Sequence, residues 1–105
     1  MKIMSFTEAV AKLQKLYMRY DQVVSQLLTL QARLRELREA KKYLEKGVGR
    51  RVYREVAELV IEVTEEEARK YVEEEEELVR LRIRKLEEEK NKLLQDIRNY
   101  ERILE

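Results

Sequence analysis

The side chains that most often carry enzyme chemistry are nearly absent from this chain. Its 105 residues include no His and no Cys, which removes the usual general base, the commonest metal ligand and every thiolate nucleophile. Ser5 and Ser25 are the only serines, and neither has a histidine base to activate it. The glycine-containing segment 47–51 lacks the strand-to-helix context of a phosphate-binding loop. We therefore expect no catalytic site, no cofactor and no metal.

Two charged clusters are the remaining polar candidates. The run Glu73 to Glu77 supplies five consecutive carboxylates, but consecutive helical positions point around the helix and do not converge on a metal, so we expect a solvated face. Arg50, Arg51 and Arg54 suggest a phosphate or nucleic-acid patch. The acidic start of the following helix would neutralise them, and the net charge of +1 gives no basic surplus. Nucleic-acid binding therefore ranks last among the functions considered.

Apolar side chains near the two chain ends offer a different chemistry, the burial of hydrophobic surface against another protein. These residues are more numerous than the seam of one two-helix coiled coil can bury. Met and aromatic side chains form adaptable binding surfaces. The residues by themselves support a second interpretation equally well, in which these side chains only pack against one another at the end of the coiled coil. The candidates are Ile3, Met4, Phe6, Val10, Leu13, Ile97, Tyr100, Ile103 and Leu104.

A second apolar set lies in the middle of the chain, in two short runs rich in β-branched and aromatic residues. Residues 52–56 and 59–63 predict a β-hairpin with a turn at Ala57-Glu58. A lone two-stranded hairpin is marginally stable and presents unpaired edges, so we expect it to pair with strands of other chains. A β-tongue packed on its own helices is the less favoured alternative. The expected interface residues are Val52, Tyr53, Val56, Leu59, Val60, Ile61 and Val63.

Two long segments with a heptad pattern determine where these two apolar sets lie in the fold. Apolar residues alternate spacings of three and four in each segment, which predicts an a/d seam. The first seam is Phe6, Ala9, Leu13, Leu16, Tyr20, Val23, Leu27, Leu30, Leu34, Leu37, Lys41 and Leu44; the second is Ala68, Val72, Val79, Ile83, Leu86, Leu93, Ile97, Tyr100 and Leu104. Lys41 is a charged core position in the first seam, and Glu76 and Lys90 interrupt the second. Arms of about 40 residues predict an antiparallel coiled coil that brings Phe6 near Leu104.

Local signals mark the boundaries of these segments. Ser5 with Glu8, and Thr64 with Glu67, have the spacing of capping boxes, and Gly47 is a natural helix stop. We expect one domain over residues 1–105, with a helix over 1–46, the hairpin over 50–63 and a second helix over 65–105.

The composition agrees with this division. Charged residues make up 43% of the chain, with no Pro and only two Gly, as is typical of long helices. No apolar stretch reaches the roughly 20 residues that span a bilayer, the N-terminus has no signal-peptide pattern, and the absence of Cys fits a reducing compartment. We therefore expect a cytoplasmic protein of mostly α class, a long antiparallel two-helix coiled coil with a β-hairpin at the bend.

The hairpin residues and the helix after them also follow a recognisable order. They read Val52-Tyr53-Arg54, Val56-Ala57, Leu59-Val60-Ile61-Glu62-Val63-Thr64, then a heptad helix with Leu86 and Leu93. This order resembles the prefoldin family, specifically its smaller β-type subunit with one hairpin per chain. Three features depart from the family pattern: Ala57 stands where Gly is usual, the loop 47–49 lacks Pro and acidic residues, and the first helix has few Gln.

The resemblance implies a function for both apolar sets. It implies a hexamer of two α-type and four β-type subunits whose hairpins join into intersubunit β-barrels. It also implies that the coiled-coil tips hold unfolded client proteins without ATP and deliver them to a group II chaperonin. The alternative is a homomeric coiled-coil scaffold that assembles through the hairpin and binds no unfolded clients.

Overall fold

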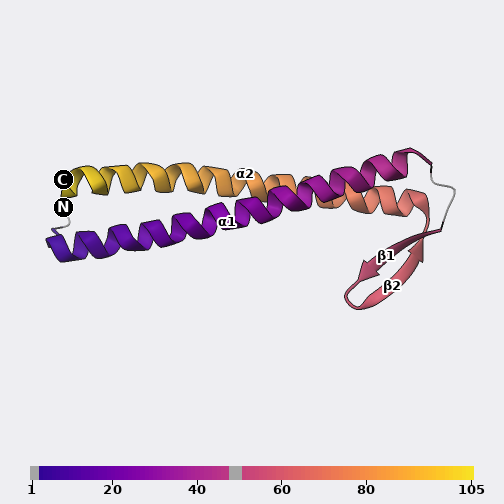
Figure 1. Cartoon of the computed structure of the whole chain (residues 1–105), viewed down its shortest axis with the longest axis horizontal. Helices are drawn as coiled ribbons and strands as arrows, with labels where there is room; N and C mark the ends of the chain where they lie inside the picture. The colour runs from indigo at the N-terminus through magenta and orange to yellow at the C-terminus, as the bar shows by residue number, and fades with distance from the viewer. Residues whose placement is uncertain (1–2, 48–50) are drawn as a thin grey trace. The chain divides into compact units, whose positions relative to one another are not determined.

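The computed structural model describes residues 3–47 and 51–105 of the chain. It contains two helices of 40 residues, α1 (Phe6–Glu45) and α2 (Glu65–Leu104), and between them in the chain two antiparallel strands, β1 (Val52–Val56) and β2 (Leu59–Val63) (Figure 1). Residue 50, where the hairpin was predicted to begin, and Gly49 lie outside the described residues. The predicted order of helix, hairpin and helix is confirmed.

The chain divides into two compact units, and both helices run through both of them. Unit 1 comprises Met1–Thr29 with Ile83–Glu105, and unit 2 comprises Leu30–Arg82. Unit 1 therefore contains the start of α1 and the end of α2, which lie at the same end of this unit in Figure 1, and unit 2 contains the hairpin.

Both predicted capping boxes form at the helix starts. The Glu8 backbone N–H donates to Ser5 Oγ (3.1 Å), and the Glu67 backbone N–H donates to Thr64 Oγ1 (3.1 Å). The α1 helix ends at Glu45, within one residue of its predicted end, because Gly47 adopts a φ of +63° and its N–H donates to the Leu44 carbonyl (3.2 Å). Its start at Phe6 differs from the predicted start at residue 1, since Ser5 caps the helix there.

In unit 1 the two helices pack antiparallel through the predicted seam. Val23, Leu27 and Leu93 are buried together, and Leu16, Tyr20, Ile83 and Leu86 pack against them. The opposite chain directions follow from two contacts, Met4 with Tyr100 near the ends and Arg19 with Glu89 further in. Burial of a shared apolar seam is what stabilises such a helix pair, since isolated helices gain little from their backbone hydrogen bonds alone.

In unit 2 the same seam continues between the second half of α1 and the first half of α2. Its buried apolar members are Leu37, Leu44, Ala68, Val72 and Val79. The Arg69 guanidinium donates to the Leu44 carbonyl (3.2 Å), which supplies a positive charge at the C-terminal end of α1, where the helix dipole favours one.

One predicted seam position is wrong. Phe6 is 70% exposed, whereas every other apolar seam residue is buried or half-buried. Phe6 is the first residue of α1, and Met4 before it lies against Tyr100 instead, with Sδ 4.0 Å from the hydroxyl oxygen. The apolar contact with α2 closest to the chain end is thus made by Met4, ahead of the helix, while the Phe6 side chain is exposed.

The hairpin has the predicted turn. Val56 pairs with Leu59 and Val52 pairs with Val63, which leaves Ala57 and Glu58 as a two-residue turn. Ala57 adopts a φ of +55°, a conformation that a side chain makes unfavourable and that glycine adopts freely. A glycine at this position would therefore adopt the turn conformation without this cost.

Candidate functional site

The first candidate is an apolar surface at the chain ends in unit 1, which we call the end surface. Ile3, Phe6 and Ile103 are its most exposed members, at 84%, 70% and 72%. Met4, Val10, Leu13, Tyr100 and Leu104 are half-buried. Ile97 is 5% exposed and belongs to the core, so it supports the surface from below and does not form part of it.

Two polar contacts hold the helix pair beneath the end surface, one on each flank. On one flank Arg19 Nε donates to Glu89 Oε1 (2.6 Å) and an Arg19 terminal nitrogen donates to Oε2 (2.9 Å). Because a carboxylate that accepts charged donors is stabilised, this contact holds the pKa of Glu89 below its usual value and raises that of Arg19. On the other flank the Tyr17 hydroxyl donates to Glu101 Oε2 (2.7 Å), which raises the pKa of that phenol.

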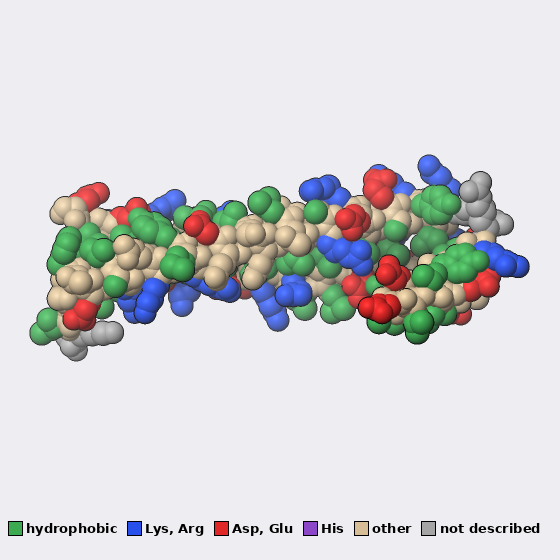
Figure 2. All heavy atoms as spheres, turned by 60° about the horizontal axis from the view of Figure 1, so that its bottom comes forward, with side chains coloured by type: hydrophobic (Ala, Val, Ile, Leu, Met, Phe, Trp, Pro, Cys, Tyr) green, Lys and Arg blue, Asp and Glu red, His purple; other side chains and the backbone are tan. Residues whose placement is uncertain are grey.

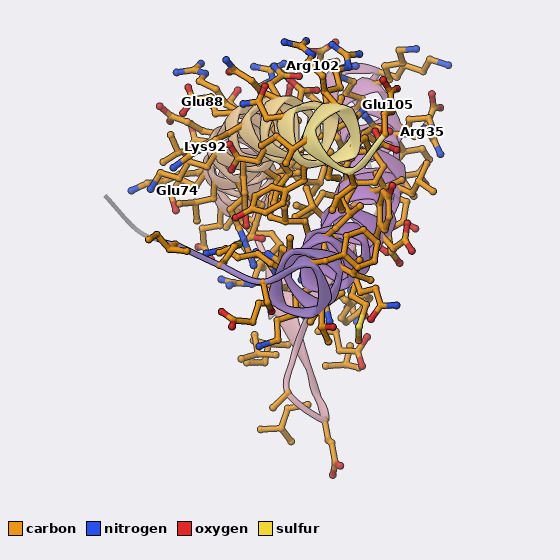
Figure 3. The ribbon with its side chains drawn as sticks, turned by 90° about the vertical axis from the view of Figure 1, so that its left-hand side faces the viewer. Arg35, Glu74, Glu88, Lys92, Arg102 and Glu105 are labelled. Atoms are coloured by element: carbon orange, nitrogen blue, oxygen red, sulfur yellow. The ribbon has the colours of Figure 1, made fainter. Side chains whose placement is uncertain are left out.

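Many other charged side chains of unit 1 are exposed. Figure 3 shows Glu88 and Arg102 on the side of α2 that is turned away from α1, and both are exposed. The exposed apolar residues at the chain ends are therefore distinct from the ordinary charged exterior of this unit. Apolar side chains gathered in this way are typical of interaction surfaces.

The second candidate is the hairpin in unit 2. Because side chains alternate along a strand, the register places Val52, Arg54, Val56, Leu59, Ile61 and Val63 on one face and Tyr53, Glu55, Val60 and Glu62 on the other. Leu59 and Val60 near the turn are 67% and 69% exposed, and Figure 2 shows apolar side chains across the hairpin. Val52 and Val63, at the base, are half-buried.

Neither face of the hairpin is covered by the chain's own helices. Tyr53, Val56 and Ile61 remain 55%, 41% and 46% exposed. A cleft of about 710 Å³ separates β1 from the helices of unit 2, and its apolar lining includes Tyr43, Leu44, Tyr71 and Val72. A β-tongue packed closely on its own helices, the less favoured alternative, would have filled this cleft.

A cation–π contact links the hairpin to α2. The Arg54 guanidinium carbon lies 3.7 Å from the centre of the Tyr71 ring, a distance typical of a cation–π interaction. Arg51 forms an exposed ion pair with Glu62 (3.7 Å). The acidic start of α2 also lies near Arg51, since Glu65 and Glu67 line one pocket with it. Neutralisation of the arginines by these carboxylates stays a prediction, and Arg50 lies outside the described residues.

These two surfaces fit what comparison with known families reveals. A family model described as a prefoldin subunit matches residues 7–105, which is almost the whole chain. The chain belongs to the prefoldin subunit family. No curated protein matches it. Membership of this family is consistent with a chaperone subunit.

The structure also revises the predicted solvated face of this prefoldin subunit. Glu73, Glu74 and Glu77 are exposed as predicted, but Glu76 is only 5% exposed. Glu76 occupies the seam position between Val72 and Val79, so the heptad spacing places its side chain toward the other helix. Its place in the seam pattern was the sequence signal that could have predicted its burial. Arg80 donates to Glu76 Oε1, while Oε2 is buried with no partner in the part of the chain that the structure describes.

Two further observations concern the described part of this prefoldin chain. None of its helices is both long and apolar enough to cross a membrane. Over the same residues, no group of three or more acidic side chains is arranged to hold a metal ion.

Proposed function

We propose that the chain is a β-type prefoldin subunit, an ATP-independent holdase that binds unfolded proteins at the tips of its coiled coils. The observation that carries this proposal is the end surface, where Ile3, Phe6 and Ile103 are each at least 70% exposed. Water-exposed apolar side chains of this size gain free energy when they are buried against apolar segments of another chain. Because unfolded proteins expose such segments and folded ones bury them, the surface distinguishes the two.

The assembly part of the proposal rests on the hairpin. Its exposed apolar faces and its two unpaired strand edges favour the addition of strands from other subunits. We propose intersubunit β-barrels in a hexamer of two α-type and four β-type subunits, located in the cytoplasm and passing clients to a group II chaperonin. A chain with a single hairpin suits the β-type place in that assembly.

A second candidate function, a scaffold without clients, is favoured by the same hairpin. The hairpin alone suffices for assembly, and the end surface would then only close the helix pair. The two candidates differ in what they require of the exposed residues near the chain ends.

The experiment that tests the assembly is co-expression with an α-type subunit, one that carries two hairpins, followed by native mass spectrometry. The expected result is one complex with twice as many copies of this chain as of its partner. If this chain remains separate as a homo-oligomer, the hetero-hexamer is excluded and the scaffold becomes the better proposal.

The experiment that tests client binding removes Met1 to Phe6 and Ile103 to Glu105. These deletions take away the three most exposed apolar residues of the end surface and leave the buried cluster of unit 1 in place. The expected result is loss of protection of an unfolded client against aggregation, with the native mass of the assembly otherwise retained. Unchanged protection would contradict the holdase function.

A further inference from the structure

A groove runs along one flank of α1 in unit 1, beside the end surface. It has a volume of about 480 Å³, and Met4, Ala11, Leu16 and Leu93 provide its apolar lining. A volume of this size falls within the range of sites that bury a ligand or a few side chains. Because Met4 also belongs to the end surface, an apolar segment bound there would continue into the groove.

The rim of the groove has an excess of positive charge. Lys12, Lys15 and Arg19 line it together with a single carboxylate, Glu8. Their spacing of three and four residues places them along one side of the helix.

The four charged groups differ in whether they have a partner. Arg19 is engaged by Glu89 through two hydrogen bonds, and Glu8 lies 3.2 Å from the Ser5 hydroxyl as part of the cap of α1. Lys12 and Lys15 form no ion pair with any of the described residues. Both ammonium groups are therefore available to a ligand.

We propose that this groove selects, among unfolded segments, those in which apolar side chains alternate with Asp or Glu. The apolar lining takes the apolar side chains, and the two lysines take the carboxylates. This inference rests on the proposed client binding and specifies its substrate class. A segment rich in Lys or Arg presents the same apolar groups but is repelled by the rim.

The physical basis is the amphipathic character of lysine. Its methylene stem lies along apolar surface while its ammonium group stays in water, so one side chain contributes to both parts of the groove. The carboxylate contacts are exposed to solvent, so the preference depends on ionic strength and decreases as salt screens the charges.

The test measures binding of three labelled peptides to the purified chain. All three peptides have the same leucines, which are separated by Glu in the first, by Ser in the second and by Lys in the third. Fluorescence anisotropy at low salt is expected to give about tenfold tighter binding of the Glu peptide than of the Lys peptide, because two exposed charge contacts are exchanged for two repulsions. At high salt the three affinities are expected to converge.

Two charge-reversed variants locate the effect. In the variant Lys12→Glu with Lys15→Glu, the order of the Glu and Lys peptides is expected to reverse. The matched control is Arg84→Glu with Arg98→Glu, which changes the net charge by the same amount as the lysine variant. Both arginines are exposed in unit 1 and lie two heptads apart, on the flank of the Tyr17–Glu101 hydrogen bond. The control is expected to keep the wild-type order.

The outcomes separate this inference from the proposed function. Binding of the Ser peptide by the wild type, and its loss in Ile3→Ser with Phe6→Ser, tests client binding without regard to charge. If the Ser peptide binds but all three peptides have equal affinity, or if the lysine variant keeps the wild-type order, the charge selection is overturned and client binding stands. If no peptide binds, both are overturned.

Discussion

Arg19 of α1 and Glu89 of α2 face each other across one flank of unit 1 and form two parallel hydrogen bonds of 2.6 and 2.9 Å. The planar guanidinium matches both oxygens of the carboxylate, so the contact fixes orientation as well as distance. It joins residues 70 positions apart in the chain. The pair therefore specifies which part of α2 lies against which part of α1.

Replacing Glu89 with Gln is expected to lower the Tm at pH 7 by no more than a few degrees, because exposed ion pairs are screened by solvent. The pKa of Glu89 is lower in the folded than in the unfolded chain, so the contribution of the pair is fully present above the unfolded value. It is lost as the pH falls through the folded value. The Tm difference between wild type and Glu89→Gln should therefore disappear in acid, as thermal unfolding followed by circular dichroism would reveal.

The control for this prediction is Glu88→Gln, at an exposed position on the outer side of α2 (Figure 3). It removes the same charge without removing the contact to Arg19. An equal loss of Tm in both variants would show that the overall charge, and not the pair, is responsible.

Replacing Glu76 with Leu is expected to stabilise the chain by about 1–2 kcal/mol, because a buried oxygen without a partner is replaced by an apolar side chain in an apolar seam. Arg80, its partner, is 54% exposed and can be solvated once the carboxylate is gone. Urea unfolding measures the change. Glu77→Leu, at an exposed neighbouring position, should change the free energy of unfolding by less than about 0.5 kcal/mol. A destabilised Glu76→Leu variant would mean that the carboxylate has a partner in solution.

Replacing Ala57 with Gly is expected to stabilise the hairpin by about 1 kcal/mol, since the φ of +55° is unfavourable for alanine and accessible to glycine. Because the hairpin can open without unfolding the helices, the measurement is amide hydrogen exchange in residues 52–56 and 59–63. Slower exchange is expected there. Glu58→Gly, at the other turn position, should make exchange faster, because glycine only adds freedom to the unfolded chain at that site.

Replacing Ile61 with Asp is expected to dissociate the assembly, because a charge placed on the shared apolar face of the hairpin has to be desolvated when another strand covers it. Ile61 is 46% exposed in the single chain, so the substitution should leave the monomer folded. Leu81→Asp on α2 is the control, since Leu81 is 43% exposed. Native mass spectrometry decides the matter: retention of the oligomer in Ile61→Asp would exclude the hairpin as the interface.

The elements and most of their ends could be predicted because local signals specify them, although α1 begins at Phe6 and not at residue 1. Ser5 and Thr64 form the predicted caps, Gly47 ends α1, and the turn at Ala57-Glu58 sets the strand register. Each of these depends on residues within a few positions of one another, so the sequence displays it directly. The heptad spacing likewise identifies the buried side of each helix, including the inward place of Glu76 that a prediction from charge alone missed.

What the sequence could not supply are the pairings between distant residues. Nothing local indicates that Arg19 lies against Glu89, that Tyr17 reaches Glu101 or that Arg54 covers Tyr71. Long side chains such as these choose among several partners within reach, and only the packing of the backbone decides the choice.

The sequence by itself thus determined two helices, a hairpin, the apolar seam and the family, because these follow from periodicity and local conformational preference. The tertiary structure alone decided which apolar residues remain exposed. It places Ile97 in the core and Phe6 in solvent, although each was predicted as a seam position of its helix. The physical reason is that exposure depends on what the neighbouring helix contacts: Met4 lies against Tyr100 of α2, while Phe6 at the start of α1 is 70% exposed.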